Sequence, residues 1–485
     1  MKLNQLLKNV DYKTNLDKNL EIEKLTCKSK DVTSKSMFAC IKGVNFDGHD
    51  FAKQALNSGA SAVLVEKSLN LPQEILVKNS HLAYAQICAN YFNNPAEKLK
   101  LIGVTGTNGK TSTTKIIKTL LSKTNKKIGL IGTIQNEIDD EILKTEKTTP
   151  DHFEFQKLLH EMLKKKCEYV VIEVSSHAIN QYRTGTAEFE IGIFLNLSQD
   201  HLDYHQTMEN YFLTKKKLFN HCKKALICID SKYGIELLNE LKHKKHKLNL
   251  KSFSTKSSNA DFYATNVKLT CKNVNYTFKS LNFEQQVEFS TPGLFAIQNS
   301  IAAIACCLML KFNSNLIFDV IKTCPPIKGR SEAIEINQPF TVICDYAHTP
   351  DGLKNILTSI KSYCNGKIIT LIGCGGDRDK KKRPIMGKIA ANNSDFVIIT
   401  SDNPRTENPA AIIEEIYLGL KDLKTPYIKI VDRKKAIEFA LKNANKNDVI
   451  LLAGKGHESY QIVGDKKLPF NEPEIVQNLT KKIFN

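Results

Sequence analysis

The chain has 485 residues, of which 41% are hydrophobic and 25% charged, and its formal net charge is +18. This composition is ordinary for a soluble globular protein, and the length predicts about three domains. No stretch approaches the roughly 20 uninterrupted apolar residues of a membrane span, and the N-terminus lacks the apolar core of a signal peptide, so we expect a cytoplasmic protein. The 13 cysteines form no Cys-x-x-Cys pair, which argues against a disulfide framework and a zinc site.

The positive charge is spread along the chain rather than gathered in one segment. The simplest interpretation is a general bias toward lysine. Among functional interpretations, a polyanionic small-molecule substrate is favoured over nucleic acid, because the densest basic segment has no interleaved aromatic residues.

Breaks in the pattern divide the chain into three blocks. Residues 1–97 mix short apolar strands, such as Ala62–Val65, with short helical stretches, and Pro95 marks the boundary. Residues 98–325 form the second block, which ends at adjacent prolines, and residues 326–485 form the third.

Short apolar runs alternate with helical patterns in the second and third blocks, which predicts parallel sheets covered by helices on both faces. The strands expected in these blocks are Leu101–Val104, Tyr169–Val174, Ile191–Leu197, Thr341–Cys344, Ile368–Ile372, Val397–Thr400 and Val449–Leu452. The helices expected among them begin at Lys110 or span Leu353–Tyr363 and Ala410–Leu420.

The strongest local signal is the sequence Gly-Val-Thr-Gly-Thr-Asn-Gly-Lys-Thr, residues 103–111, between a predicted strand and a predicted helix. Its glycines let backbone N–H groups close around phosphate, and the helix N-terminus adds partial positive charge. Val104 stands where the usual P-loop has its first glycine, and a purely structural turn is the alternative interpretation. The ATP-binding residues predicted here are Gly106, Thr107, Asn108, Gly109, Lys110, Thr111 and Ser112, with Lys110 on the terminal phosphates and Thr111 on Mg²⁺.

This variant loop resembles that of the Mur ligases, three-domain enzymes that add amino acids to UDP-N-acetylmuramic acid, and the resemblance extends over essentially the whole chain. It implies an α/β fold with an N-terminal UDP-binding α/β domain (1–97), a central P-loop parallel-sheet ATPase domain (98–325) and a C-terminal Rossmann-like domain (326–485) that carries the amino acid and closes over the nucleotide. It also implies a monomer that uses ATP, two Mg²⁺ ions and small-molecule substrates, with no nucleic-acid or membrane partner.

The predicted catalytic residues are Lys110, Glu173, His201 and Lys215. Glu173 ends a strand beside the loop, where a carboxylate is well placed for Mg²⁺. The resemblance makes Thr111, Glu173 and His201 metal ligands and makes Lys215 a carbamylated lysine, although His201 alone would also fit a core histidine and Lys216 follows directly. A neutral amine can capture CO₂ and the resulting anion can ligate Mg²⁺, whereas an ammonium would repel the metal.

The resemblance also assigns contacts to the two nucleotides. Lys28 and Lys30 replace the Asp and Arg that usually flank the serine of the family's Asp-Ser-Arg segment, and Ala296 replaces an asparagine expected near the adenine. The threonine pair before Pro150 could equally cap a helix. The residues implied for the UDP-linked peptide are Ser29, Thr148, Thr149, Ser175, Gln181 and Arg183, and those added for ATP are Asn299, Arg330, Asp345 and His348.

The incoming amino acid is predicted from two loops of the third block. Asp402-Asn403-Pro404-Arg405 matches the signature of the family members that add meso-diaminopimelate, whose second carboxylate lysine lacks. Arg405 can bind that carboxylate through charge-assisted hydrogen bonds worth roughly 1.5–3 kcal/mol, and would repel the ammonium of lysine. The full predicted set is Arg378, Asp402, Asn403, Pro404, Arg405, Gly454 and Glu458, with Glu458 accepting the free ammonium.

The function implied is an ATP-dependent amide ligase of peptidoglycan precursor synthesis. It would phosphorylate the D-Glu γ-carboxylate of UDP-MurNAc-L-Ala-D-Glu and couple the acyl phosphate to meso-diaminopimelate. The alternatives are a lysine-adding Mur ligase, a folylpolyglutamate synthetase-like ligase and, from a different class, a P-loop ATPase stimulated by nucleic acid.

Overall fold

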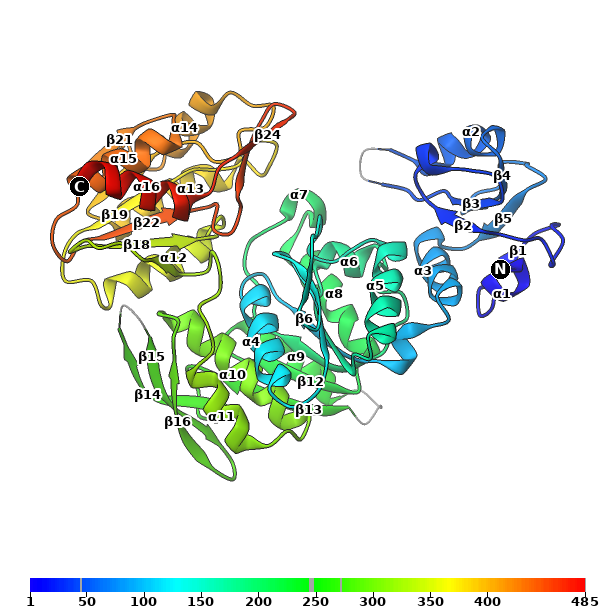
Figure 1. Ribbon diagram of the computed structural model, residues 1–485, viewed down its shortest axis with the longest axis horizontal. Helices are drawn as coiled ribbons and strands as arrows, with labels where there is room; N and C mark the ends of the chain where they lie inside the picture. The colour runs from blue at the N-terminus through cyan, green and yellow to red at the C-terminus, as the bar shows by residue number, and fades with distance from the viewer. Residues whose placement is uncertain (44–45, 244–247, 271–272, 485) are drawn as a thin grey trace.

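The computed structural model describes residues 1–484 except 44–45, 244–247 and 271–272. The chain forms three lobes in sequence order, each built on a sheet of its own (Figure 1). The N-terminal lobe and the C-terminal lobe, blue and yellow to red in the figure, lie on either side of the central one. In the part of the chain that is described, no helix is long and apolar enough to cross a membrane.

The N-terminal lobe contains a five-stranded sheet with the order β1-β5-β4-β3-β2. Strands β2 to β5 pair in parallel, and β1 pairs antiparallel with β5. The predicted strand Ala62–Val65 lies within β4. The elements are α1 (Leu3–Leu6), β1 (Tyr12–Lys13), β2 (Lys24–Thr26), η1 (Ser29–Asp31), β3 (Ser36–Ala39), η2 (Gly48–Phe51), α2 (Ala52–Asn57), β4 (Ala60–Val65), β5 (Glu74–Val77) and α3 (Ser80–Tyr91).

The connection to the central lobe follows α3. Asn93 and Asn94 have φ values of +60° and +49°, a conformation that asparagine tolerates better than most residues. The short helix η3 (Pro95–Lys98) then leads into β6 (Lys100–Thr105), at the place where the sequence predicts a boundary.

The central lobe contains an eleven-stranded sheet with the order β16-β15-β14-β13-β12-β11-β6-β10-β7-β8-β9. The strands from β14 to β7 pair in parallel, as the alternating pattern predicts, whereas the β15–β16 and β8–β9 extensions are antiparallel and were not predicted. The remaining strands are β7 (Ile128–Ile131), β8 (Asn136–Ile138), β9 (Glu141–Leu143), β10 (Tyr169–Glu173), β11 (Phe189–Phe194), β12 (Lys224–Cys228), β13 (Asn249–Ser254), β14 (Phe262–Leu269), β15 (Val274–Ser280) and β16 (Glu284–Phe289).

Helices cover both faces of this sheet and bury two hydrophobic cores. The amphipathic helix α4 buries Ile116, Ile117, Leu120 and Leu121 as its spacing predicts, and Cys306 and Cys307 are buried in α10. All twelve described cysteines are free. The helices are α4 (Lys110–Ser122), α5 (His152–Lys164), α6 (Ser176–Asn180), α7 (Leu202–His205), α8 (Met208–Lys216), η4 (Lys217–His221), α9 (Lys232–Lys242), α10 (Leu294–Met309) and α11 (Ser314–Lys322).

The C-terminal lobe contains a six-stranded sheet with the order β17-β18-β22-β19-β20-β21, parallel except for β17. The four predicted strands are present, and the predicted helix Ala410–Leu420 ends earlier, at Tyr417. The elements are β17 (Glu332–Ile334), β18 (Thr341–Asp345), α12 (Pro350–Lys361), β19 (Ile368–Ile372), α13 (Lys382–Asn393), β20 (Phe396–Ile399), α14 (Pro409–Tyr417), β21 (Tyr427–Lys429), α15 (Arg433–Asn443), β22 (Val449–Ala453), β23 (Tyr460–Val463), β24 (Lys466–Pro469) and α16 (Glu472–Phe484). The predicted α/β fold class is confirmed.

A fully buried ion pair holds the carboxyl ends of two C-terminal strands. Nε of Arg433 lies 2.6 Å from Glu472 in α16, and both side chains are 0% exposed. The same guanidinium donates to the carbonyls of Ser401 (3.3 Å) and Ala453 (2.9 Å), which directly precede two predicted amino-acid-binding segments. The pair therefore fixes the spacing between those segments.

Replacing Glu472 with glutamine should lower the free energy of unfolding by about 3 kcal/mol, because the guanidinium of Arg433 would be buried without its counter-charge. Chemical denaturation followed by circular dichroism measures this. Glu474 is exposed on the same helix, so Glu474→Gln is the matched control and should change the value by less than about 0.5 kcal/mol. Equally small effects of the two substitutions would contradict the role of the pair.

Candidate active site

The predicted phosphate loop connects β6 to α4. Gly109 has a φ of +87°, and a Cβ atom there would collide with Oδ1 of Asn299, so the position requires glycine. Nζ of Lys110 donates to the carbonyls of Gly106 (2.8 Å) and Thr107 (2.9 Å). Loop N–H groups, a helix N-terminus and a lysine amine thus meet at the carboxyl edge of the sheet, an arrangement that suits an anion.

Asn196, which the sequence analysis did not select, fixes the conformation of this loop. Its Oδ1 accepts a hydrogen bond from the backbone N–H of Asn108 (2.9 Å), and its Nδ2 donates to the carbonyl of Asn108 (3.1 Å). The signal that could have found it is its place after β11, which pairs in parallel with β6. Polar residues that follow neighbouring parallel strands meet at one edge of the sheet.

Glu173 ends β10, on the other side of β6, and is 1% exposed. Its Oε2 accepts hydrogen bonds from the hydroxyls of Thr111 and Thr133, both at 2.9 Å, and its Oε1 accepts from the backbone N–H of Thr133 (2.8 Å). The carboxylate therefore stands directly beside the threonine that follows the loop lysine, as predicted.

Lys215 lies in α8, is 1% exposed, and reaches the same loop from the opposite side. Its Nζ donates to the carbonyl of Gly106 (2.9 Å), which also accepts from Lys110. Burial and the neighbouring Lys110 lower the pKa of Lys215 well below its ordinary value. The geometry therefore favours an uncharged, nucleophilic amine at this position.

His201 directly precedes α7 and has a φ of +52°, a left-handed conformation that is uncommon outside glycine. Its ring meets that of His177 edge-on, with centroids 4.9 Å apart. Burial lowers the pKa of His201 to about 4, although the nearby carboxylate of Asp200 acts to raise it. The imidazole is therefore neutral near pH 7. A neutral imidazole is the form that binds metals.

The residues present fit a magnesium ion. No three His, Cys, Asp or Glu side chains of the described residues form a metal cluster by themselves. Mg²⁺, however, usually keeps several waters and binds one or two carboxylates together with substrate phosphates. The carboxylate of Glu173 and the hydroxyl of Thr111, next to the phosphate loop, supply that kind of oxygen set.

Four of the six residues predicted for the UDP-linked peptide form one hydrogen-bonded group in the central lobe. Thr149 Oγ1 donates to the carbonyl of Glu173 (2.7 Å) and accepts from the backbone N–H of Ser175 (3.1 Å). Arg183 donates to the carbonyl of Thr149 (2.8 Å) and to Oε1 of Gln181 (2.8 and 3.0 Å). Thr148 joins the group by accepting a hydrogen bond from Thr133 (3.1 Å).

Ser29, the predicted UDP contact, lies in η1 of the N-terminal lobe. It does not line the nearby cavity of about 510 Å³ between the N-terminal and central lobes, although Thr26, Cys27 and Lys28 do. Four lysines line this cavity: Lys24, Lys28, Lys144 and Lys147. The sequence analysis considered only Lys28, because the four come from two segments that are distant in the chain.

The C-terminal lobe meets the phosphate loop at two hydrogen bonds. Nη2 of Arg330 donates to Oγ1 of Thr111 (3.2 Å), and Nδ2 of Asn108 donates to Asp351 (3.1 Å). A cavity of about 80 Å³ lies between the two lobes at this junction. The predicted ATP residues among its lining are Asn108, Gly109, Ser112, Asn299, Arg330 and Asp345.

His348 was predicted beside ATP but faces a neighbouring cavity. Its Nδ1 and the carbonyl of Tyr346 are 2.8 Å apart, and burial lowers its pKa to about 4. Tyr346, which the sequence analysis did not select, lines both cavities and lies 4.7 Å from the guanidinium of Arg330.

That neighbouring cavity, of about 270 Å³, brings the predicted amino-acid residues together. Nδ2 of Asn403 donates to Oε2 of Glu458 (2.8 Å), and Lys455 donates to both side chains (3.0 and 3.1 Å). His201 of the central lobe forms part of the facing wall. The predicted residues that line this cavity are His201, His348, Arg378, Asp402, Asn403, Arg405, Gly454 and Glu458.

Two arginines give this cavity its positive end. Arg405 has a φ of +52°, and its Nη1 donates to the carbonyl of Gly376 (2.6 Å). Arg378 is exposed on the adjoining loop. Pro404 does not line the cavity; its carbonyl lies against Gly376, where a Cβ atom would collide with it. Lys382 and Lys455 are basic residues of this region that the sequence analysis did not select.

Comparison with known proteins matches each lobe to a family model. Residues 21–102 match the Mur ligase family catalytic domain, residues 104–307 the Mur ligase middle domain, and residues 329–456 the Mur ligase glutamate ligase domain. The chain is 42% identical, over 99% of both chains, to the UDP-N-acetylmuramoyl-L-alanyl-D-glutamate--2,6-diaminopimelate ligase of Caldanaerobacter subterraneus subsp. tengcongensis.

Solved structures show the same likeness. A structure of a UDP-N-acetylmuramoyl-L-alanyl-D-glutamate--2,6-diaminopimelate ligase superposes with a TM-score of 0.71 at 28% identity, covering 100% of this chain and 99% of the other. The MurF ligase of Thermotoga maritima in complex with ADP superposes with a TM-score of 0.64 at 20% identity, covering 96% and 99%.

Unfolding should become easier as the pH falls from 6.5 to 4. Burial lowers the pKa of His348 to about 4 and those of His152 and His457 to about 3. The unfolded chain therefore binds more protons than the folded one in this window, and each such histidine costs about 1.4 kcal/mol of stability per pH unit. Denaturation at several pH values measures the slope, which His457→Gln should reduce. A pH-independent stability would contradict this.

Proposed function

The chain belongs to the Mur ligase family, and we propose that it joins meso-2,6-diaminopimelate to the D-Glu γ-carboxylate of UDP-MurNAc-L-Ala-D-Glu at the expense of ATP. The observation that carries this proposal is the C-terminal cavity, in which Arg405 and Arg378 stand near Glu458, opposite His201 of the central lobe. This reaction would supply a cytoplasmic precursor of peptidoglycan.

Both ends of diaminopimelate have a partner in this cavity. Arg405 and Arg378 suit its distal carboxylate, because a guanidinium binds carboxylate through two parallel N–H groups. Glu458, held by Asn403 and Lys455, suits an ammonium group. Lysine keeps the distal ammonium but has a hydrogen atom in place of the distal carboxylate, so only diaminopimelate gives the arginines an anionic partner.

The proposed reaction has two steps. The γ-carboxylate oxygen attacks the terminal phosphorus of ATP, releasing ADP and giving an acyl phosphate. The amine of diaminopimelate then attacks the acyl carbon, loses a proton and displaces inorganic phosphate to leave an amide. In this proposal Lys110 offsets charge on the migrating phosphoryl group, and Arg183 and Thr149 orient the muramyl peptide.

Magnesium, held by Glu173 and Thr111, would offset phosphate charge in this reaction. We propose that Lys215 is carbamylated in the active enzyme, since its amine is buried beside Lys110 and its pKa is strongly lowered. His201 would complete the ligand set on the side that faces the amino-acid cavity.

Each lobe has a separate task in this proposal. Residues 1–97 hold the uridine end, residues 98–325 hold ATP and the muramyl peptide, and residues 326–485 bring the amino acid. The hydrogen bonds from Arg330 to Thr111 and from Asn108 to Asp351 keep the C-terminal lobe against the phosphate loop, which excludes water from the acyl phosphate.

Phosphate release from ATP tests the substrate assignment directly. With Mg²⁺ and UDP-MurNAc-L-Ala-D-Glu, turnover should require meso-diaminopimelate, and L-lysine should not replace it. Arg405→Ala should lower kcat/KM for diaminopimelate by about 10- to 100-fold, with little change in the KM for ATP, because it removes a charge-assisted pair.

The control for this experiment is Lys381→Ala, a nearby exposed lysine outside the cavity. Turnover mainly with lysine would contradict the role of Arg405 while leaving the family assignment intact. Turnover with a folate and glutamate, or ATP hydrolysis that needs DNA or RNA, would replace the proposed function.

Lys215→Ala should reduce ligation at least about 100-fold while leaving the folded protein intact, because it removes the amine that would carry the carbamate. Steady-state turnover together with a thermal melt measures both. Lys216→Ala provides the matched control, since Lys216 is the next residue and pairs with Glu240 (2.7 Å) away from the loop. Undiminished activity of Lys215→Ala would refute the proposed role.

A further inference from the structure

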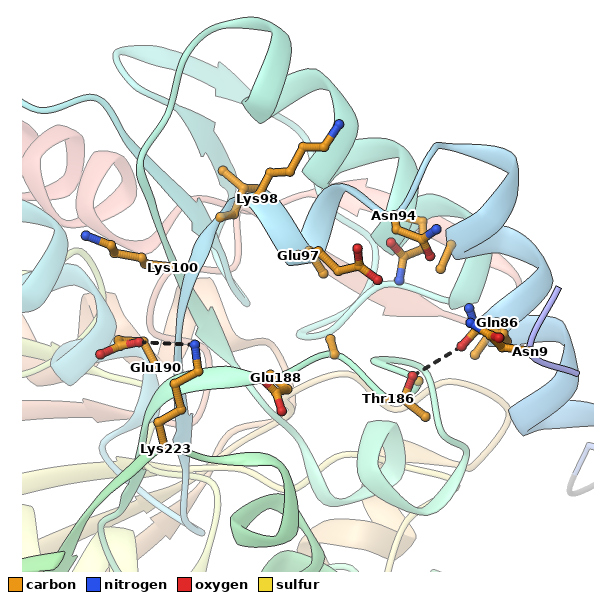
Figure 2. A pocket seen from close by; sticks show the side chains of 17 residues that line it. Asn9, Gln86, Asn94, Glu97, Lys98, Lys100, Thr186, Glu188, Glu190 and Lys223 are labelled. Carbon is orange, nitrogen blue, oxygen red and sulfur yellow. Dashed lines mark hydrogen bonds and ion pairs between the residues drawn. The ribbon is translucent and has the colours of Figure 1, made fainter. Parts of the chain in front are cut away.

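A further cavity, of about 610 Å³, lies away from the proposed active site (Figure 2). It is formed where the N-terminal lobe meets the central one. Helix α3, the connecting helix η3 and the loop before β11 supply most of its lining, and α5 supplies Gln156. No residue predicted for ATP, the muramyl peptide or diaminopimelate lines it.

One buried hydrogen-bond acceptor in this cavity lacks a donor, and two exposed carboxylates lie near it. Gln156 is only 3% exposed, and its Oε1 has no hydrogen-bond partner. A buried acceptor without a donor costs about 1–3 kcal/mol, so a ligand N–H group here would be stabilising. Glu97 and Glu188 form no ion pair among the described residues, whereas Glu190 beside them pairs with Lys224 (2.6 Å).

Side chains of both charges line the same cavity. Figure 2 shows Lys98, Lys100 and Lys223 on one side and the amides of the lining on the other, with Glu97 and Glu188 between them. Lys98 makes no ion pair in the described part of the chain, and Lys100 contacts only the hydroxyl of Tyr169 (3.3 Å) and its ring. The cavity therefore presents uncompensated charges of both signs.

A compact metal ion does not suit these groups. The carboxylates do not converge with a third His, Cys, Asp or Glu side chain into a metal cluster among the described residues. An extended ligand that carries an ammonium and a carboxylate at separate positions matches the arrangement of acceptors and lysines.

The walls of the cavity are held rigidly enough to recognise a small molecule. Gly185 has a φ of +59°, and a Cβ atom there would lie 3.2 Å from Cβ of Ala85 in α3. Beside it, the hydroxyl of Thr186 donates to Oε1 of Gln86 across the two lobes (3.2 Å). A preformed cavity spends less free energy on ordering when a ligand binds.

We propose that this interlobe cavity binds a small zwitterion, an amino acid or short peptide. The ammonium group of the ligand lies against Glu97, Glu188 and Oε1 of Gln156, and its carboxylate faces Lys98 and Lys100. The ligand bridges the N-terminal and central lobes, so it stabilises their observed arrangement. This site is separate from the proposed ligase reaction.

Isothermal titration of the full-length protein with glycylglycine, without ATP or nucleotide, tests the proposal independently of catalysis. The dipeptide should bind, and Glu188→Gln should weaken binding about tenfold, the loss expected for one charge-assisted hydrogen bond. Glu188 is exposed, so this substitution leaves the fold intact. Gln156→Leu should weaken binding as well, while Glu236→Gln, on the exposed face of α9, should not.

Putrescine and succinate separate the proposed ligand class from simpler ones. Binding of putrescine with no binding of the dipeptide would replace the zwitterion by a cation, and binding of succinate alone would replace it by an anion. Absence of dipeptide binding, or binding that Glu188→Gln and Glu236→Gln affect equally, would overturn the site.

Discussion

The buried amine of Lys215 and the partly buried amine of Lys110 converge on one carbonyl oxygen, and the chemistry of the central lobe follows from that arrangement. Nζ of Lys110 and Nζ of Lys215 donate to Gly106 at 2.8 and 2.9 Å. Two ammonium ions at such short range repel, which disfavours a proton on both amines at once. Burial lowers the pKa of both lysines, and Asp200 opposes the lowering at both, but Glu173 opposes it at Lys110 only, whereas Lys110 lowers the pKa of Lys215 further. The arrangement therefore favours the neutral form at Lys215, whose lone pair is then available to an electrophile.

The same loop ties together elements that are far apart in sequence. Tyr211 of α8 places its ring 4.7 Å from Nζ of Lys215 and its hydroxyl 3.3 Å from that of Thr107, so α8 and the loop hold each other in place. From the C-terminal lobe, Arg330 reaches Thr111. A shift of the loop would therefore displace three groups together: the amine of Lys215, the carboxylate of Glu173 and the hydrogen bond from Arg330 to Thr111.

Sequence reasoning located the features whose position follows from local pattern. The Gly-Lys-Thr turn and the Asp402–Arg405 loop each follow a buried parallel strand, and strand ends meet at one edge without further information. It missed side chains whose position depends on the pairing of segments that are distant in the sequence. Asn196 gains its position beside the phosphate loop only through the parallel pairing of β11 with β6. The β14–β16 extension was missed because its alternation of buried and exposed residues is broken by a register shift between Thr265 and Lys268.

The lysines at positions 28 and 30 are a local departure from the family pattern, and Lys28 lies with other lysines around one cavity. Replacing an arginine by lysine keeps the charge but loses the planar fork that grips a phosphate at two points. The fold gathers Lys24, Lys28, Lys144 and Lys147 around one cavity, and these come from two segments more than 100 residues apart. Several point charges that surround an anion can replace one directional contact, since Coulomb attraction needs no particular orientation. For the proposed nucleotide substrate, recognition of the diphosphate would then depend on the closure of the N-terminal lobe over β8 and β9, rather than on a single residue of the Thr26–Lys30 segment.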